Sequence, residues 1–220
     1  MDDRQRVPGD GGLKFFGTIT ASVTHELNNV ISIIDQVSGL LKDMTAGAEA
    51  GFTLQPEQLK KIHERISHQA QRGVEIIKSL NSFAHSVDEP VRDVELKSLV
   101  GNLFSLSRRF AELQRVVLTV QLPEDEIRTR TDPYALQYIL FHSFRRMLAH
   151  AERDDRILIG LAAEETAVIS ISGPAGSGGS EEEISRETVK ELAERLSLRL
   201  SSSIKDQTEK VDIRLPVLPL

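Results

Sequence analysis

Cysteine is missing from this sequence of 220 residues. Its absence excludes disulfide bonds, thiolate metal sites and a cysteine nucleophile, and it is typical of proteins in a reducing cytoplasm. Basic residues are also in the minority, because 27 Lys and Arg stand against 33 Asp and Glu, for a formal charge of −6. Nucleic-acid binding depends on clustered positive charge, so we expect no nucleic acid among the partners.

Long apolar segments are missing as well. The sequence has no run of about 18 apolar residues, the minimum for a membrane-spanning helix. Residues 1–12 are polar and charged where a signal peptide needs an apolar stretch. We therefore expect a cytoplasmic protein without membrane insertion, with a disordered N-terminus over residues 1–12. The 40% hydrophobic content allows one large core or two smaller ones.

Two long amphipathic helices are predicted in the first part of the chain. From residue 16 to residue 41, apolar side chains recur every three or four positions. Residues 42–55 contain two glycines and precede Pro56, so we predict a loop there and a second helix from Pro56 to about Ser86. The apolar positions are Phe16, Ile19, Val23, Leu27, Val30, Ile34, Val37 and Leu41 in the first helix, and Leu59, Ile62, Ile66, Ala70, Gly73, Ile77, Leu80 and Ala84 in the second.

Such a pair of helices cannot bury both apolar stripes alone. At about 1.5 Å per residue each helix is a rod of roughly 40 Å, and the contact between two such rods is too narrow to cover the stripes. We therefore expect residues 13–88 to form a helical hairpin that pairs with a second copy in a homodimeric four-helix bundle.

The remainder of the chain has a different spacing of apolar residues. Residues 86–93 contain Pro90 and four charged residues, which indicates a domain boundary. Beyond it we predict helices at 94–112, 133–151 and 183–196, strands at 116–121, 126–131, 156–162, 166–172, 197–204 and 210–215, and a glycine-rich loop at 173–180. Mixed helices and mostly antiparallel strands indicate an α+β sandwich over residues 94–220.

His25 is the candidate for chemistry in the first helix. It lies about 160° around the helix from the centre of the apolar stripe, so its ring should face solvent. Glu26 is a carboxylate that could reach an imidazole nitrogen and fix its tautomer. The neighbours that we expect on the same face, all small or amide-bearing, are Thr18, Ser22, Asn29 and Ser32.

A single helical histidine is more often an ordinary surface residue, but the sequence around this one is specific. Residues 24–29 read Thr-His-Glu-Leu-Asn-Asn, preceded by Phe-Gly at 16–17 and Ala-Ser at 21–22. This segment resembles the H box of bacterial sensor histidine kinases, whose pattern is small-Ser-x-x-His-Glu-Leu-x-Asn.

The resemblance implies a role for each part of the chain. Residues 13–88 resemble the dimerisation and histidine-phosphotransfer hairpin, with His25 phosphorylated and Glu26 as its base or orienting acid. In the same family, the position of Asn29 places a water that dephosphorylates a partner response regulator. Residues 94–215 resemble the catalytic ATPase domain, and residues 132–140 match the lead-in to its N box.

The nucleotide motifs depart from the family pattern. The resemblance implies two asparagines that hold Mg²⁺ and phosphate, and this chain has His142 and Arg146 there. The adenine-binding D-x-G-x-G is replaced by Ile-Ser-Gly-Pro-Ala at 171–175, and the second glycine motif by Glu-Ile-Ser at 183–185. We therefore expect a degenerate ATPase-like domain without ATP binding, autokinase activity or any cofactor of its own, Mg²⁺ being supplied by the partner.

Two other motifs give no site. The loop at 173–180 approaches a P-loop, but Gly179 stands where the phosphate-binding lysine is needed. His63 and His68 are five residues apart, whereas two ligands on one helix face are spaced by four, so we predict no metal site.

Three functions remain open. The first is a dimeric histidine phosphotransferase, similar to those of bacterial phosphorelays, that exchanges phosphoryl between His25 and the aspartate of response-regulator receiver domains. The second is a response-regulator phosphatase that uses Glu26 and Asn29. The third is a pseudokinase scaffold that needs no His25. By analogy, partner choice should depend on Ser32, Asp35 and Gln36 and on residues 42–55.

Overall fold

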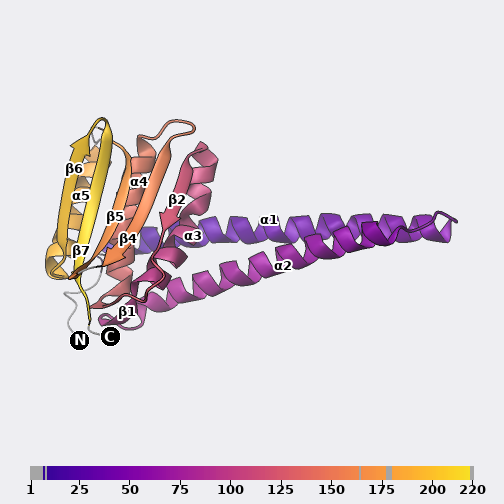
Figure 1. Cartoon of the computed structure of the whole chain (residues 1–220), viewed down its shortest axis with the longest axis horizontal. Coiled ribbons are helices and arrows are strands. Elements are labelled where there is room, and N and C mark those ends of the chain that lie inside the picture. Colours follow the sequence, from indigo (N-terminus) through magenta and orange to yellow (C-terminus); the bar gives the residue numbers. More distant parts are fainter. Residues whose placement is uncertain (1–6, 8, 164, 177–179, 219–220) are drawn as a thin grey trace.

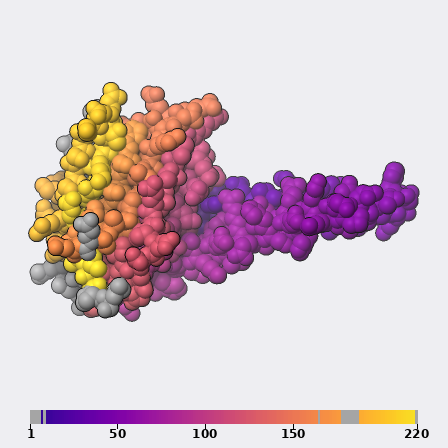
Figure 2. Space-filling view, in the orientation of Figure 1, coloured from indigo at the N-terminus to yellow at the C-terminus, as the bar shows by residue number. Residues whose placement is uncertain are grey.

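The computed structural model describes residues 7, 9–163, 165–176 and 180–218. It has two parts, a long helical hairpin and a sandwich of helices on a sheet (Figure 1). The space-filling view shows the hairpin as a rod projecting from the sandwich (Figure 2). This arrangement leaves most of the hairpin surface uncovered by the rest of the chain.

The hairpin consists of α1 (Gly9–Glu49) and α2 (Pro56–Ala84), followed by the short 3-10 helix η2 (His85–Val87). Two expectations about α1 are wrong. Residues 9–12 belong to the helix although disorder was predicted there, whereas residues 1–6 and 8 lie outside the described residues. The predicted loop at 42–55 is helical up to Glu49, because Lys, Met, Ala and Glu in this segment favour helix and a single internal glycine costs only about 1 kcal/mol.

A hydrogen-bonded cap ends α1. The amide of Phe52 donates to the carbonyl of Gly47 at 3.0 Å, and the amide of Gly51 donates to the carbonyl of Ala48 at 3.0 Å. Gly51 has a φ of +96°, which a residue with a Cβ adopts only with strain. These two bonds satisfy carbonyls that the helix end leaves free and turn the chain toward Pro56.

The buried faces of the two helices meet along the hairpin. Ile19, Val23 and Val30 are buried in α1, as the spacing predicts. In α2 the buried face is rotated slightly from the predicted apolar stripe. Ile76, which is outside the predicted stripe, is buried, whereas Ile77, which belongs to it, is 47% exposed. Among the described residues, neither helix has a stretch sufficiently apolar to cross a bilayer.

The sandwich contains a five-stranded sheet in the order β2-β4-β5-β7-β6 (Figure 1). Its strands are β2 (Val117–Gln121), β4 (Arg156–Ala163), β5 (Thr166–Pro174), β6 (Arg199–Lys205) and β7 (Thr208–Pro216). The β2–β4 pair is parallel and the other pairs are antiparallel. Buried residues alternate along β4 and β5, which is typical of a sheet with one covered face.

Three helices cover that face: α3 (Leu96–Gln114), α4 (Pro133–Ala149) and α5 (Ser180–Arg195). A second, two-stranded antiparallel sheet joins β1 (Arg92–Glu95) to β3 (Arg128–Thr131). The strand β1 was not predicted, because four residues of mixed polarity have no period of their own and depend on β3 as a partner.

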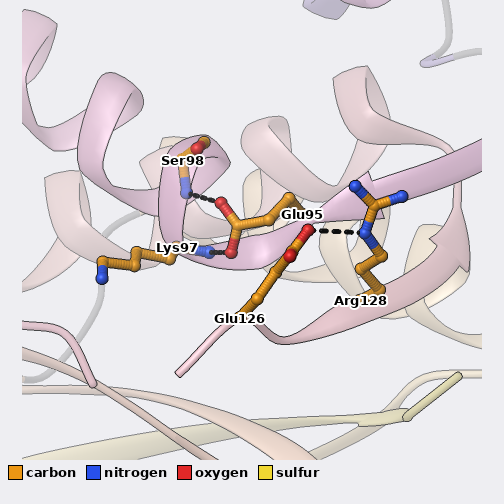
Figure 3. Close-up of polar contacts among 5 residues, drawn as sticks. All are labelled: Glu95, Lys97, Ser98, Glu126 and Arg128. Atoms are coloured by element: carbon orange, nitrogen blue, oxygen red, sulfur yellow. Dashed lines mark hydrogen bonds and ion pairs between the residues drawn. The ribbon is translucent and has the colours of Figure 1, made fainter. Parts of the chain in front are cut away.

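Glu95 fixes the start of α3. Its carboxylate accepts hydrogen bonds from the amides of Lys97 at 2.9 Å and Ser98 at 2.6 Å (Figure 3). Burial raises the pKa of Glu95, but the hydrogen bonds from Ser98 and Lys97 outweigh burial and leave this pKa below its usual value. Nearby, Arg128 donates to Glu126 at 2.6 Å. This junction makes α3 follow β1 without an intervening loop.

An aromatic cluster joins the hairpin to the sandwich. The buried ring of Phe15 in α1 has its centroid 5.3 Å from that of Phe83, 5.4 Å from Tyr134, 5.6 Å from Tyr138 and 5.0 Å from Phe141. The hydroxyl of Tyr134 also donates to the carbonyl of Gly12 at 2.6 Å. The base of the hairpin is therefore part of the hydrophobic core that holds α4.

Candidate functional site

His25 lies near the middle of α1 with an exposed side chain. It is roughly 150° around the helix from the buried line of Val23 and Val30, which explains the exposure. Its ring makes no hydrogen bond with any residue that the structure describes. Asn29, one turn later, is also exposed on this side of the helix. The ring is accessible to a partner protein.

The carboxylate of Glu26 has a different partner from the one that the sequence suggests. Nη2 of Arg72 in α2 donates to Oε1 of Glu26 at 2.8 Å. The Glu26 side chain is 14% exposed and that of Arg72 is 42% exposed. The expected contact between Glu26 and the imidazole is not formed, because the register of the hairpin places Arg72 opposite this turn of α1.

Ser22 is a second departure from expectation. It was predicted on the accessible face beside His25, but its exposure is only 5%. The reason is that α1 packs against α3 as well as α2, so the buried surface of α1 is wider than a single stripe. The Oγ of Ser22 has no hydrogen-bond partner among the described residues.

A second apolar flank of the hairpin is exposed. Ile31 is 61% exposed in α1, and Val74 and Ile77 are 45% and 47% exposed in α2. Ile31 lies six positions after His25, so the two side chains leave α1 about 120° apart. The exposed apolar flank and the His25 face are therefore different sides of the hairpin.

A groove of about 460 Å³ lies on the hairpin beyond His25. It is lined by Ile33 of α1, two turns after the histidine, and by Lys61, Arg65 and His68 of α2. Glu64 and Gln69 complete the lining. Three side chains that are basic or can become so give this groove a chemistry suited to an acidic protein surface.

In the sandwich, α4 carries the two positions at which the N-box register predicts metal-binding asparagines. His142 is the first, and its ring centroid lies 4.1 Å from that of Tyr138. Burial, with a smaller contribution from the positive charge of Arg145, lowers the pKa of His142 to about 4. The ring is neutral at pH 7.

Arg146 is the second position. Its Nη2 donates to Oε1 of Glu209 in β7 at 2.5 Å, and Oγ of Ser202 in β6 donates to the same oxygen at 2.7 Å. The side chains of Arg146 and Glu209 are only 16% and 6% exposed. This interior ion pair ties α4 to two strands of the sheet.

Comparison with solved structures identifies the fold. The catalytic domain of histidine kinase ThkA matches with a TM-score of 0.51 and 10% identity, over 59% of this chain and 99% of that domain. Histidine kinase ThkA in complex with response regulator protein TrrA matches with a TM-score of 0.51 and 15% identity, over 94% of this chain and 63% of the kinase chain. The chain has a histidine kinase core-like fold. The cytoplasmic segment of histidine kinase QseC also matches, with a TM-score of 0.50 and 10% identity, over 67% of this chain and 95% of that segment. The sequence itself matches no protein-family model and no curated protein.

Within this histidine kinase-like fold, the end of β5 runs directly against the end of α4. A Cβ placed on Gly176 would overlap the ring of His150, so a larger residue there would require that ring to move. A Cβ on Gly173 would lie 3.0 Å from Ile157 and 3.2 Å from Met147. The predicted glycine loop is thus partly strand, up to Pro174, and residues 177–179 lie outside the described residues.

Two functional candidates were missed by the sequence reasoning. Arg72 lies 46 residues from Glu26 and Glu209 lies 63 residues from Arg146, so each pair depends on the folded register. The one available signal was the isolated charge of Glu209 at an inward-facing position of a strand with alternating burial. His25, Glu26 and Asn29 share one segment of α1, whereas His142 and Arg146 belong to the sandwich.

Proposed function

We propose that this chain is a histidine phosphotransferase of a two-component phosphorelay. A histidine kinase-like fold supports two-component signalling in general. The observation that carries the proposal is the exposed ring of His25, which makes no hydrogen bond with a described residue. It lies on a hairpin whose attached sandwich has Arg146, paired with Glu209, at an expected metal-binding position. On this reading, residues 13–88 form the phosphotransfer unit and residues 94–220 form a degenerate ATPase-like unit.

For the transfer itself, the chain needs to supply little more than a nucleophile that is accessible to the receiver. The unprotonated nitrogen of the His25 ring attacks phosphorus of a phospho-aspartate on a receiver domain. The bond from phosphorus to the aspartate oxygen breaks, and the carboxylate leaves with the bonding electrons. The transition state is loose and rich in negative charge, so alignment and charge stabilisation dominate, with Mg²⁺ bound by the receiver. Reversal onto a second receiver completes the relay.

The side chains of α4 and β7 argue against ATP as the phosphoryl source. A magnesium ion needs oxygen ligands, and a bound nucleotide needs open space beside them. Arg146 offers a positive charge already paired with Glu209, and His142 offers a neutral ring packed at a tilt against Tyr138. This donor set does not fit Mg²⁺ and triphosphate. We infer that the sandwich holds its fold without nucleotide.

A response-regulator receiver is the partner that this surface fits. The matched ThkA structure is a complex with the response regulator TrrA, which supports the same class of partner here. The groove lined by Ile33, Lys61 and Arg65 lies on the hairpin within two to three turns of His25. We propose that the receiver docks over this groove and His25, with Ser32 and Gln36 contributing to partner choice.

We also propose that the chain is a homodimer. The exposed flank with Ile31, Val74 and Ile77 is an apolar surface along the hairpin that a second copy would bury. Pairing through this flank would form a four-helix bundle and leave His25 in solvent, because Ile31 and His25 are about 120° apart on α1.

We expect Ile31→Glu to convert the dimer to a monomer. A charge at the centre of a buried helix seam is costly unless it is paired, and the seam gives it no partner. Sedimentation velocity measures the change, with Asn28→Glu as the matched control on the same helix. A wild-type monomer, or an Ile31→Glu variant that stays dimeric, would contradict the proposed seam.

The proposed transfer is tested with a panel of receiver domains charged by a small-molecule phosphodonor. We expect acid-labile, base-stable phosphoryl on this chain from at least one receiver, with matching loss from that receiver. If no receiver delivers phosphoryl and His25→Ala keeps full activity in cells, the scaffold reading replaces the transferase.

Phosphatase activity is the second candidate, and the exposure of Asn29 one turn after His25 favours it. An amide at this place could hold a water against a docked phospho-aspartate. We expect Asn29→Ala to slow hydrolysis of the phosphorylated receiver at least about tenfold while phosphohistidine formation survives. Release of inorganic phosphate measures hydrolysis, and equal loss of both reactions would show that Asn29 serves folding or docking instead.

A further inference from the structure

Arg72 lies on the same face of the hairpin as His25. It precedes Gly73, whose Cα faces Val30, so its side chain leaves α2 about 100° from the line of contact with α1. His25 is likewise rotated away from the contact line on α1. Because the two helices are antiparallel, both rotations bring the side chains of Arg72 and His25 to the same side of the hairpin. Val74 leaves α2 on the opposite flank and is 45% exposed there.

The contact between Arg72 and Glu26 leaves most of the guanidinium unused. Only Nη2 takes part in the 2.8 Å hydrogen bond, and the other two nitrogens make no hydrogen bond with any described residue. The side chain is 42% exposed, whereas Glu26 is 14% exposed. The Arg72 guanidinium is thus partly exposed to solvent, whereas the Glu26 carboxylate that it binds is mostly buried.

A free carboxylate at this place would hinder the proposed transfer. Glu26 is the residue adjacent to His25, and a phosphoryl group carries close to two negative charges. Two anions on the same turn of a helix repel, and the repulsion is stronger at a partly enclosed site than in bulk water. Without Arg72, the carboxylate could also turn to accept a hydrogen bond from the ring N–H of His25, which would bring its negative charge closer to the phosphoryl group.

We propose that Arg72 is a positioning residue for phosphotransfer, which holds Glu26 away from the His25 ring and neutralises its charge as the phosphoryl group arrives. This inference rests on the proposed phosphotransferase function. Arg72 acts through Glu26, so its effect should vanish when Glu26 is also made neutral. That dependence separates positioning from a simple role in holding α1 to α2.

The test measures the maximal rate of phosphoryl transfer from a phosphorylated receiver to the protein of residues 1–220. We expect Arg72→Gln to lower this rate about 10-fold to 100-fold with little change in the receiver concentration at half-saturation. Arg72→Lys should recover most of the rate, because it restores the positive charge. The double variant Glu26→Gln with Arg72→Gln should also recover most of it. Lys78→Gln, an exposed charge elsewhere on α2, should behave as wild type.

Each other outcome overturns the inference. An Arg72→Gln variant as fast as wild type removes any role for Arg72. A double variant as slow as Arg72→Gln means that the ion pair acts only as a structural tie. Thermal unfolding of every variant checks the fold, and the lysine and double variants remain informative if Arg72→Gln unfolds. Absence of phosphoryl on wild type would overturn the proposed function itself and this inference with it, whereas failure of the variants alone leaves the function standing.

Discussion

The variant His25→Gln should carry no acid-labile phosphoryl group after incubation with a phosphorylated receiver. Glutamine keeps the polarity and helix propensity of the position but has no nucleophilic nitrogen lone pair of the imidazole type. Because the His25 side chain is exposed and makes no hydrogen bond with a described residue, its replacement should leave the unfolding temperature unchanged. Autoradiography of the chain, with and without acid treatment, measures the loss.

His63→Gln is the matched control for this prediction. His63 is also an exposed histidine of the hairpin, on α2, where its Nε2 lies 3.5 Å from the Oγ of Ser67. We expect the His63 variant to be labelled as wild type. Label that persists on His25→Gln, or label lost equally from both variants, would move the phosphoryl carrier elsewhere.

The largest effect on stability is expected at Arg146 and Glu209. These side chains are 16% and 6% exposed, and Ser202 donates to the same carboxylate oxygen as Arg146. Removal of one partner from a buried ion pair leaves an uncompensated charge, which typically costs about 3–5 kcal/mol of unfolding free energy. We expect Arg146→Met to lose about this much in urea unfolding.

The paired variant and a surface control make this prediction specific. The double variant Arg146→Met with Glu209→Met should recover most of the loss, because two apolar side chains of similar volume can replace a buried pair. Lys60→Gln removes one member of an exposed pair with Glu64 on α2 and should cost less than about 1 kcal/mol. A cost for Arg146→Met no larger than that of Lys60→Gln would mean that the pair does not hold the sandwich together.

The long elements could be predicted from the sequence because their periods repeat many times. The apolar spacing of residues 16–41 predicts α1, and alternation predicts the β4–β5 hairpin. The ends could not be predicted equally well. Helix continues to Glu49 where favourable residues outweigh one glycine, and β1 forms only because β3 lies beside it.

The sequence predicted only those features of the site that depend on a single helix. The exposure of His25 follows from its rotation from the apolar stripe, which needs no knowledge of a neighbour. The burial of Ser22 requires α3, and the pairing of Glu26 requires the register of α2 against α1. A single sequence contains no periodic signal for such contacts between distant segments.

The source of the phosphoryl group tests the account most directly. The wild-type chain is incubated in parallel with labelled Mg²⁺–ATP and with a labelled phosphorylated receiver, and label on the His25 peptide is measured over time. We expect label on His25 from the receiver and none from ATP. Saturable, His25-dependent labelling from ATP would contradict the account, because it would require a working nucleotide site between α4 and β5.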